Sequence, residues 1–145
     1  GADVADDSYA LTTSYVVFDS NLAVTFKTPP SEFVEIQATF TYGQGAGGRN
    51  VFASISDNAT YALNSLTHPN QFEKAVTVGA LRGGNGVVTM SWQVASGNLN
   101  SIGVSNTLYF AAKCNSTAGT PTLYWGGDAT DEYQNFVMKA IALPA

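Results

Sequence analysis

Residues 33–42 alternate apolar and polar side chains, and this period of two constrains the fold more than any other feature of the chain. The apolar positions are Val34, Ile36, Ala38, Phe40 and Tyr42, and the polar ones are Glu35, Gln37, Thr39 and Thr41. Successive side chains of a β-strand point to opposite faces, whereas a helix repeats every ~3.6 residues. The segment therefore predicts a strand with one face in a core.

Shorter β-forming runs recur along the chain, and turn-forming residues separate them. We expect strands at 14–18, 22–26, 50–56, 73–81, 86–94, 107–113, 123–125 and 136–143, and no helix. The turn residues at 19–21, 82–85 and 126–132 predict three hairpins, 14–26, 73–94 and 123–143. In the second hairpin, Val88, Met90, Trp92 and Val94 would share one face.

The end of the chain is apolar. Phe136, Val137, Met138, Ile141 and Leu143 lie within eight residues, which predicts a final strand in the middle of a sheet. We expect its removal to unfold the domain.

Eight or nine strands with one long irregular connection at 61–72 predict an all-β fold, an antiparallel two-sheet β-sandwich of jelly-roll type. A simple meander barrel is the alternative. The length of 145 residues fits one domain, which we place at 13–145 behind an N-terminal arm of residues 1–12.

Charged residues make up only 12% of the chain, about half the usual share, and Ser, Thr, Asn, Gln and Gly fill the polar positions. This deficit favours a surface that is partly covered in an assembly. The net charge is −5 and the six basic residues are scattered, which argues against a nucleic-acid partner. No apolar run has the ~18 residues of a spanning helix, so we expect no membrane insertion.

The sequence carries no catalytic signature, and we predict that the protein is not an enzyme. His68 is the only histidine, and no Gly-x-Ser-x-Gly motif is present. Cys114 is the only cysteine, so it forms no intrachain disulfide, and its position at the end of an apolar run is typical of a small buried hydrophobe.

The acidic residues of 126–132 lack the spacing of a calcium loop, so we interpret that segment as a solvated loop and predict neither a metal nor a cofactor. Trp125 and Tyr133 flank this loop and would stack on a sugar ring, although packing across the terminal hairpin explains them equally well. With Asp128 and Asp131 they form a candidate contact for a ligand or receptor.

Three segments together, 31–36 (SEFVEI), 54–61 (SISDNATY) and 123–144 (LYWGG through FVMKAIALP), resemble small virion surface proteins of tailed bacteriophages. The resemblance implies a jelly-roll sandwich similar to tumour-necrosis-factor-like modules. It also implies a homotrimer that decorates the capsid, bound to the major capsid protein or another virion protein. Such a protein is assembled in the host cytoplasm and lies on the virion surface.

On this interpretation the N-terminal arm contacts the shell, through Asp3, Val4, Asp6, Asp7, Tyr9 and Leu11. Two alternatives stay open. One is a tail or head-fibre module that recognises a host glycan or surface protein through loops 43–48, 97–105 and 128–132, and the other is a carbohydrate-binding module.

Overall fold

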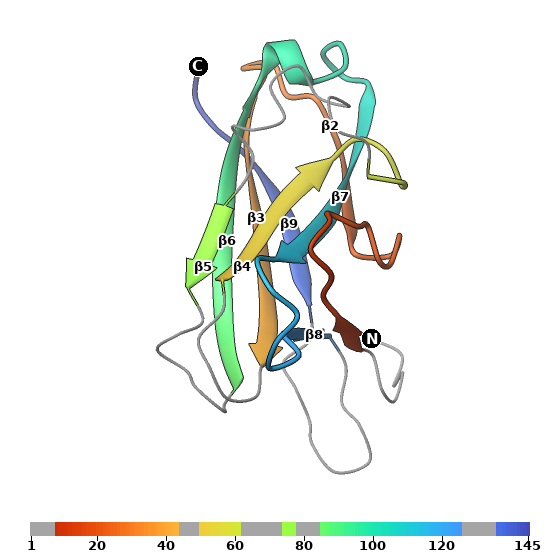
Figure 1. Ribbon diagram of the computed structural model, residues 1–145. Helices are drawn as coiled ribbons and strands as arrows, with labels where there is room; N and C mark the ends of the chain where they lie inside the picture. The colour runs from red at the N-terminus through yellow and green to blue at the C-terminus, as the bar shows by residue number, and fades with distance from the viewer. Residues whose placement is uncertain (1–7, 44–49, 62–73, 78–84, 126–135) are drawn as a thin grey trace.

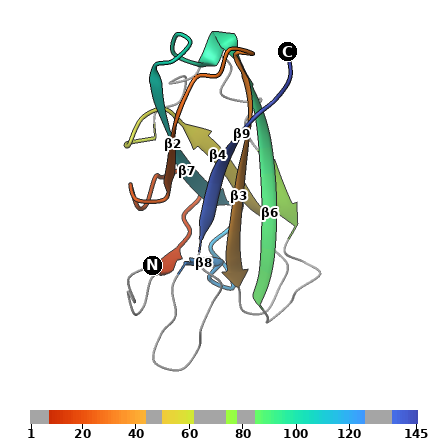
Figure 2. The ribbon, with the colours of Figure 1, turned by 180° about the vertical axis from the view of Figure 1, so that it is seen from behind.

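The computed structural model of the chain describes residues 8–43, 50–61, 74–77, 85–125 and 136–145. These residues form two antiparallel sheets that face each other (Figures 1 and 2). The strands are β1 Ser8–Ala10, β2 Ala23–Lys27, β3 Phe33–Gly43, β4 Asn50–Ser56, β5 Lys74–Thr77, β6 Asn85–Ala95, β7 Ser105–Cys114, β8 Thr122–Tyr124 and β9 Val137–Ala142. A single 3₁₀ turn, Ser96–Asn98, follows β6.

The strands pair in a nested order. β1 pairs with β8, β2 with β7, β3 with β6 and β4 with β5, as in one long hairpin rolled upon itself. The pairings of β8 and β9 with β3 complete a five-stranded sheet, and the pairing of β7 with β4 completes a four-stranded sheet. This is the connectivity of a jelly roll, so the predicted sandwich is confirmed.

The predicted terminal hairpin is wrong. β8 pairs with Thr41–Gly43 of β3, and β9 pairs with Val34–Thr39 of the same strand, so both lie on the side of β3 that is opposite β6. Figure 2 shows β9, β3 and β6 next to one another. Among the described strands β9 pairs only with β3, so it lies at an edge and not in the middle of the sheet as predicted.

The other two hairpins are also wrong, although most of their strands exist. Val16 forms a bridge with Ala112, and β2 pairs with β7, so both segments lie along β7 and not against each other. Likewise β5 pairs with β4 whereas β6 pairs with β3, in opposite sheets. The turn residues at 19–21 do form a turn, because the backbone N–H of Asn21 donates to Asp19 Oδ1 at 2.8 Å.

The core lies between the sheets and follows the predicted alternation. The five alternating apolar residues of β3, Val34 to Tyr42, are buried, and Met90, Trp92 and Val94 of the neighbouring strand β6 are buried on the same face of the sheet. Phe110 of β7 joins the two sheets, since its ring centroid lies 5.1 Å from that of Phe40 and 5.2 Å from that of Phe136. The first contact is tilted and the second is edge-on, and aromatic contacts of this kind add to the hydrophobic burial.

The described part of the predicted N-terminal arm, residues 8–12, belongs to the sandwich. β1 pairs with β8, and the ring of Tyr9 stacks on Phe18 at 4.8 Å between centroids. The side chain of Leu11 is buried in the core, and its N–H donates to the carbonyl of Pro121 at 2.9 Å.

Candidate interaction surfaces

The predicted site residues divide into two groups. Asp3, Val4, Asp6, Asp7, Asp128, Asp131 and Tyr133 lie outside the described residues. Leu11, Tyr9 and Trp125 are described, and all three pack on the core of their own domain. The ring centroid of Trp125 lies 5.2 Å from that of Phe18, which supports the packing interpretation of this tryptophan.

The solvent-facing side of the five-stranded sheet, here called the outer sheet face, contains the largest exposed apolar side chains on any strand that the structure describes. Its residues follow from the register of β6, β3 and β9 and are Val87, Thr89, Ser91, Gln93, Glu35, Gln37, Thr39, Val137, Lys139 and Ile141. Val87 is 53% exposed, Val137 47% and Ile141 36%.

Charges are sparse on the outer sheet face. Glu35 and Lys139 are its only charged residues, and Glu35 accepts a hydrogen bond from Gln37 Nε2 at 2.8 Å. The hydroxyls of Thr39 and Thr89 share a cross-strand hydrogen bond of 2.8 Å, which holds two neighbouring strands together on this face. Depletion of charge around exposed apolar side chains is typical of the inner part of a protein interface.

The apolar residues of β9 were assigned to the core by the sequence analysis, and Val137 and Ile141 are instead exposed. A signal for this was present in the sequence. Lys139 occupies the same parity as Val137 and Ile141, and a lysine rarely points into a core. The alternation of residues 137–142 therefore predicts that Val137 and Ile141 are exposed, if Lys139 is assumed to face solvent.

A second candidate surface is the loop of residues 96–104, here called the braced loop, at the end of the sandwich away from the N-terminus (Figure 1). Ile102 and Val104 are 53% and 48% exposed on it. The loop is tied to the end of β2 by backbone bonds, since the N–H of Thr28 donates to the Val104 carbonyl at 3.0 Å and Gly103 N–H donates to the Thr28 carbonyl at 2.9 Å. Gly103 has φ of +81°, a conformation that favours glycine.

Buried polar side chains complete this connection. Asn106 Nδ2 donates to Thr28 Oγ1 at 2.8 Å, and Thr28 Oγ1 in turn donates to the carbonyl of Asn100 at 2.8 Å. Asn106 Oδ1 accepts the backbone N–H of Asn100 at 2.8 Å. The braced loop thus presents two apolar side chains on a backbone that hydrogen bonds tie to the end of β2 and to β7.

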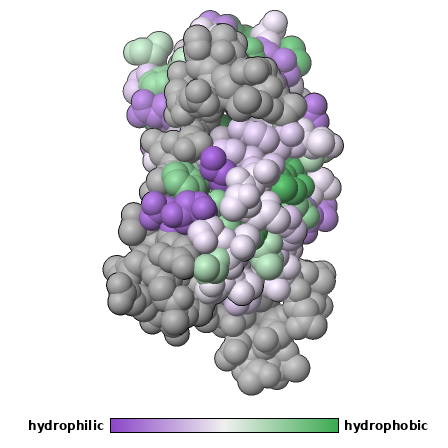
Figure 3. All heavy atoms as spheres, viewed as in Figure 1, coloured by the Kyte–Doolittle hydropathy of each residue, from purple (hydrophilic) through white to green (hydrophobic). Residues whose placement is uncertain are grey.

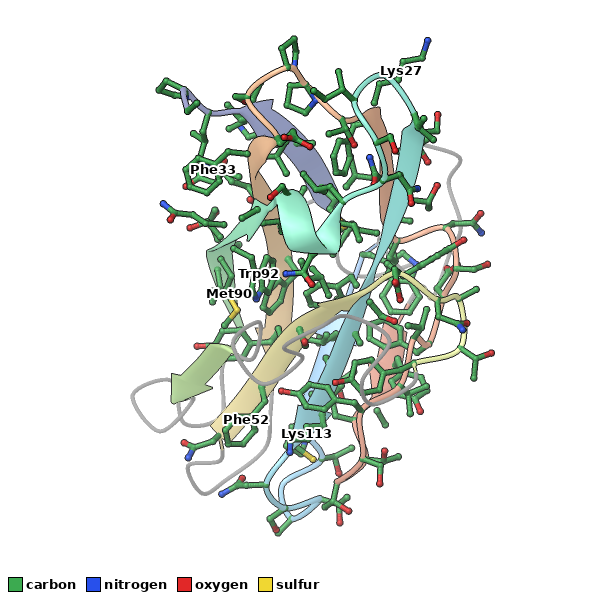
Figure 4. All side chains as sticks on the ribbon, turned by 90° about the horizontal axis from the view of Figure 1, so that it is seen from above. Lys27, Phe33, Phe52, Met90, Trp92 and Lys113 are labelled. Carbon is green, nitrogen blue, oxygen red and sulfur yellow. The ribbon has the colours of Figure 1, made fainter. Side chains whose placement is uncertain are left out.

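On the outer side of the four-stranded sheet, in contrast, the charged side chain of Lys113 contacts aromatic rings of the same domain. Lys113 Nζ lies 4.7 Å from the ring centroid of Tyr15 and 5.2 Å from that of Phe52, and the rings of Tyr15 and Tyr61 are 5.0 Å apart. Figure 4 shows Phe52 and Lys113 side by side on β4 and β7, which pair at these residues. Each cation–π contact is worth about 0.5–1 kcal/mol.

The space-filling view of this side shows mostly pale, weakly polar surface with small hydrophilic and hydrophobic patches (Figure 3). It has no broad apolar area among the described residues. The outer sheet face and the braced loop are therefore the stronger candidates for contact with another molecule.

Cys114 behaves as predicted for a buried hydrophobe. Its side chain is buried at the end of β7, and its Sγ donates to the carbonyl of Thr12 at 3.3 Å. Burial raises the pKa of the thiol, so the protonated form is retained near neutral pH. Burial likewise raises the pKa of Tyr42.

Among the described residues, no group of three or more His, Cys, Asp or Glu side chains is arranged to hold a metal ion. A search of the same residues for membrane-spanning helices finds none of sufficient length and hydropathy.

Comparisons of the chain with family models, with curated proteins and with solved structures find no significant match.

Proposed function

We propose that this protein is a non-enzymatic structural protein of a tailed-bacteriophage virion, a homotrimeric subunit that decorates and stabilises the capsid. The observation that carries the proposal is the outer sheet face, which has exposed Val87, Val137 and Ile141 and only two charged residues. Such a face is stabilised when it is buried against another protein. The three segments that resemble virion surface proteins support the virus particle as the setting.

A decoration subunit acts by burying area across the junctions of a shell. A specific protein interface buries about 1,600 Å² in total. Because the contact repeats over the whole particle, a modest free energy per subunit adds up to a large resistance of the shell to expansion. This role needs a folded domain with an apolar surface for binding, and the outer sheet face of the sandwich is such a surface.

The test is the mass of the purified protein by light scattering, followed by its binding to undecorated capsids. We expect a trimer that binds capsids, and we expect Val137→Asp to reduce the mass threefold because it places a carboxylate in the buried interface. Thr25→Asp is the matched control, since Thr25 is exposed on β2 of the other sheet. A monomeric wild-type protein, or a Val137→Asp variant that stays trimeric and capsid-bound, would contradict the proposal.

The braced loop favours a second candidate function, recognition of the host surface by a fibre or tail module. Its fixed backbone presents Ile102 and Val104 without an ordering cost on binding. If this function is correct, the purified protein coats host cells, and Ile102→Ser together with Val104→Ser abolishes the coating. Of the other loops predicted for this role, residues 44–48 and 128–132 lie outside the described residues.

A carbohydrate-binding module has less support. Trp125, the tryptophan that was its best candidate, packs on Phe18, and Trp92 is buried in the core.

A further inference from the structure

We propose that the edge of β6 that faces away from β3 pairs in antiparallel fashion with β6 of a second copy of this chain, so that two five-stranded sheets become one continuous sheet. The contact goes beyond the proposed trimer, because it is made by backbone hydrogen bonds at a strand edge and not by the outer sheet face. It requires a two-fold axis, whereas the trimer requires a three-fold axis.

The edge of β6 that faces away from β3 is long, and it is unpaired among the strands that the structure describes. β6 pairs with β3 over all eleven of its residues, and no other strand that the structure describes pairs with its opposite side. Along such an edge the N–H and C=O groups of alternate residues point away from the sheet. They are a template for another strand unless the sequence blocks it.

The other edges of the two sheets carry such blocks, and β6 carries none. β9 has Lys139, β2 has Lys27, and β5 is four residues long and begins with Lys74. β1 has only three residues. A short strand or a charged residue is the usual defence of an edge. The sequence of β6, NGVVTMSWQVA, contains no charged residue and no proline.

The sequence of β6 is also complementary to itself. When Ser91 is placed on the two-fold axis, Thr89 lies opposite Gln93 of the second copy on the outer face. On the core-facing side, Val88 lies opposite Val94, and Met90 lies opposite Trp92. Cross-strand pairs of β-branched and aromatic residues stabilise antiparallel sheets. No charge meets a like charge anywhere in this register.

The exposure of the core-facing side chains of β6 indicates which of them a second copy would cover. Val88 is only half-buried, whereas its partner Phe40 on β3 is fully buried. Met90 retains 8% exposure opposite Ala38, which has none. Trp92 and Val94 of the same row are fully buried, so the apolar layer is left incomplete only toward the Val88 end of the β6 edge. A second copy is the partner that continues it with residues of the same kind.

Disulfide trapping tests this register directly. Directly opposed residues of an antiparallel pair have Cα atoms ~4.5–5.5 Å apart, within the ~4.4–6.8 Å that a disulfide spans. We expect Ser91→Cys to form covalent dimers under a mild oxidant about tenfold faster, or more, than Thr25→Cys on β2. The wild-type protein is the background control, since Cys114 is buried.

A mixing experiment sharpens the test. Thr89→Cys and Gln93→Cys should each remain uncrosslinked alone and should form a mixed disulfide when the two variants are combined, because these positions oppose each other across the axis. In hydrogen exchange, alternate amides of β6 should become more protected as the protein concentration rises, and those of β9 should not.

Cross-linking of Ser91→Cys that is no faster than that of Thr25→Cys would overturn the proposal, as would the absence of a mixed disulfide. These results are independent of the trimer. If the protein is a monomer by light scattering but Ser91→Cys cross-links, the proposed trimer is contradicted and the proposed edge contact is supported. If the protein is a trimer but Ser91→Cys fails to cross-link, only the proposed edge contact is contradicted.

Discussion

At the scale of the residue, Asn106 decides the shape of the braced loop. It is buried, and its amide bonds to Thr28 and Asn100, which come from different parts of the chain. An asparagine can donate and accept at once, which is what this position requires. A buried polar group without its partner costs more free energy than the hydrogen bond itself contributes. Asn106 is therefore a structural residue on which the exposed Ile102 and Val104 depend.

We expect Asn106→Ala to lower the free energy of unfolding by about 2–3 kcal/mol, because it removes the buried hydrogen bond to the Thr28 hydroxyl and also the acceptor of the Asn100 N–H. Asn100→Ala is the control, since the Asn100 side chain is exposed and donates only to the Ser105 carbonyl. It should cost less than about 1 kcal/mol. Urea unfolding measures both values, and equal midpoints for the two variants would show that Asn106 does not brace the loop.

At the scale of the element, the segment 136–142 is two-sided. Phe136 packs on Phe110, and Met138 and Ala140 pack against the core, whereas Val137 and Ile141 face solvent. The segment thus contributes one apolar row to the fold and offers another to a partner. Its pairing with β3 explains how an edge strand presents apolar residues outward without unfolding.

Two adjacent substitutions separate these roles. We expect Phe136→Ala to lower the unfolding free energy by about 2–3 kcal/mol, somewhat less than the ~3–5 kcal/mol of a fully buried phenylalanine. Val137→Ala should change it by no more than about 0.5 kcal/mol in the isolated domain. Thermal or urea unfolding at low protein concentration, below assembly, is the measurement. A larger loss for Val137→Ala than for Phe136→Ala would reverse the assignment of faces.

At the scale of the whole molecule, the nested pairing places two weak acids in the interior of opposite sheets, Tyr42 on β3 and Cys114 on β7. Burial disfavours their charged forms and raises both pKa values in the folded state. As pH rises, the unfolded chain loses these protons first, so the global stability is full below the unfolded pKa and falls above it.

We therefore expect wild-type stability to fall above about pH 8.5, the usual pKa of a free thiol, before tyrosines titrate near pH 10. The fall from this one group is at most about 1.4 kcal/mol per pH unit. Cys114→Ala removes the group, so the variant should lose less stability than the wild type between about pH 7 and pH 9.5. Urea midpoints at the two pH values give the comparison, and identical losses would assign the pH dependence to other residues.

Local periodicity determined which segments are strands. The alternation of residues 33–42 predicts β3 to within one residue, and residues 50–56 coincide with β4. The shared face of Met90, Trp92 and Val94 is likewise a matter of parity along one strand. These features follow from the sequence because a period of two is a property of neighbouring residues and needs no partner.

Only the tertiary structure decided which strands pair and which residues meet. Turn-forming residues indicate that the chain reverses, but they do not indicate whether the next strand stays in the same sheet or joins the other one. After β5, which pairs with β4, the chain passes to the opposite sheet, where β6 pairs with β3. The braced loop depends on a bond between Asn106 and Thr28, 78 positions apart. Such contacts are selected by burial of the two apolar rows against each other, a property of the assembled sandwich and of no single segment.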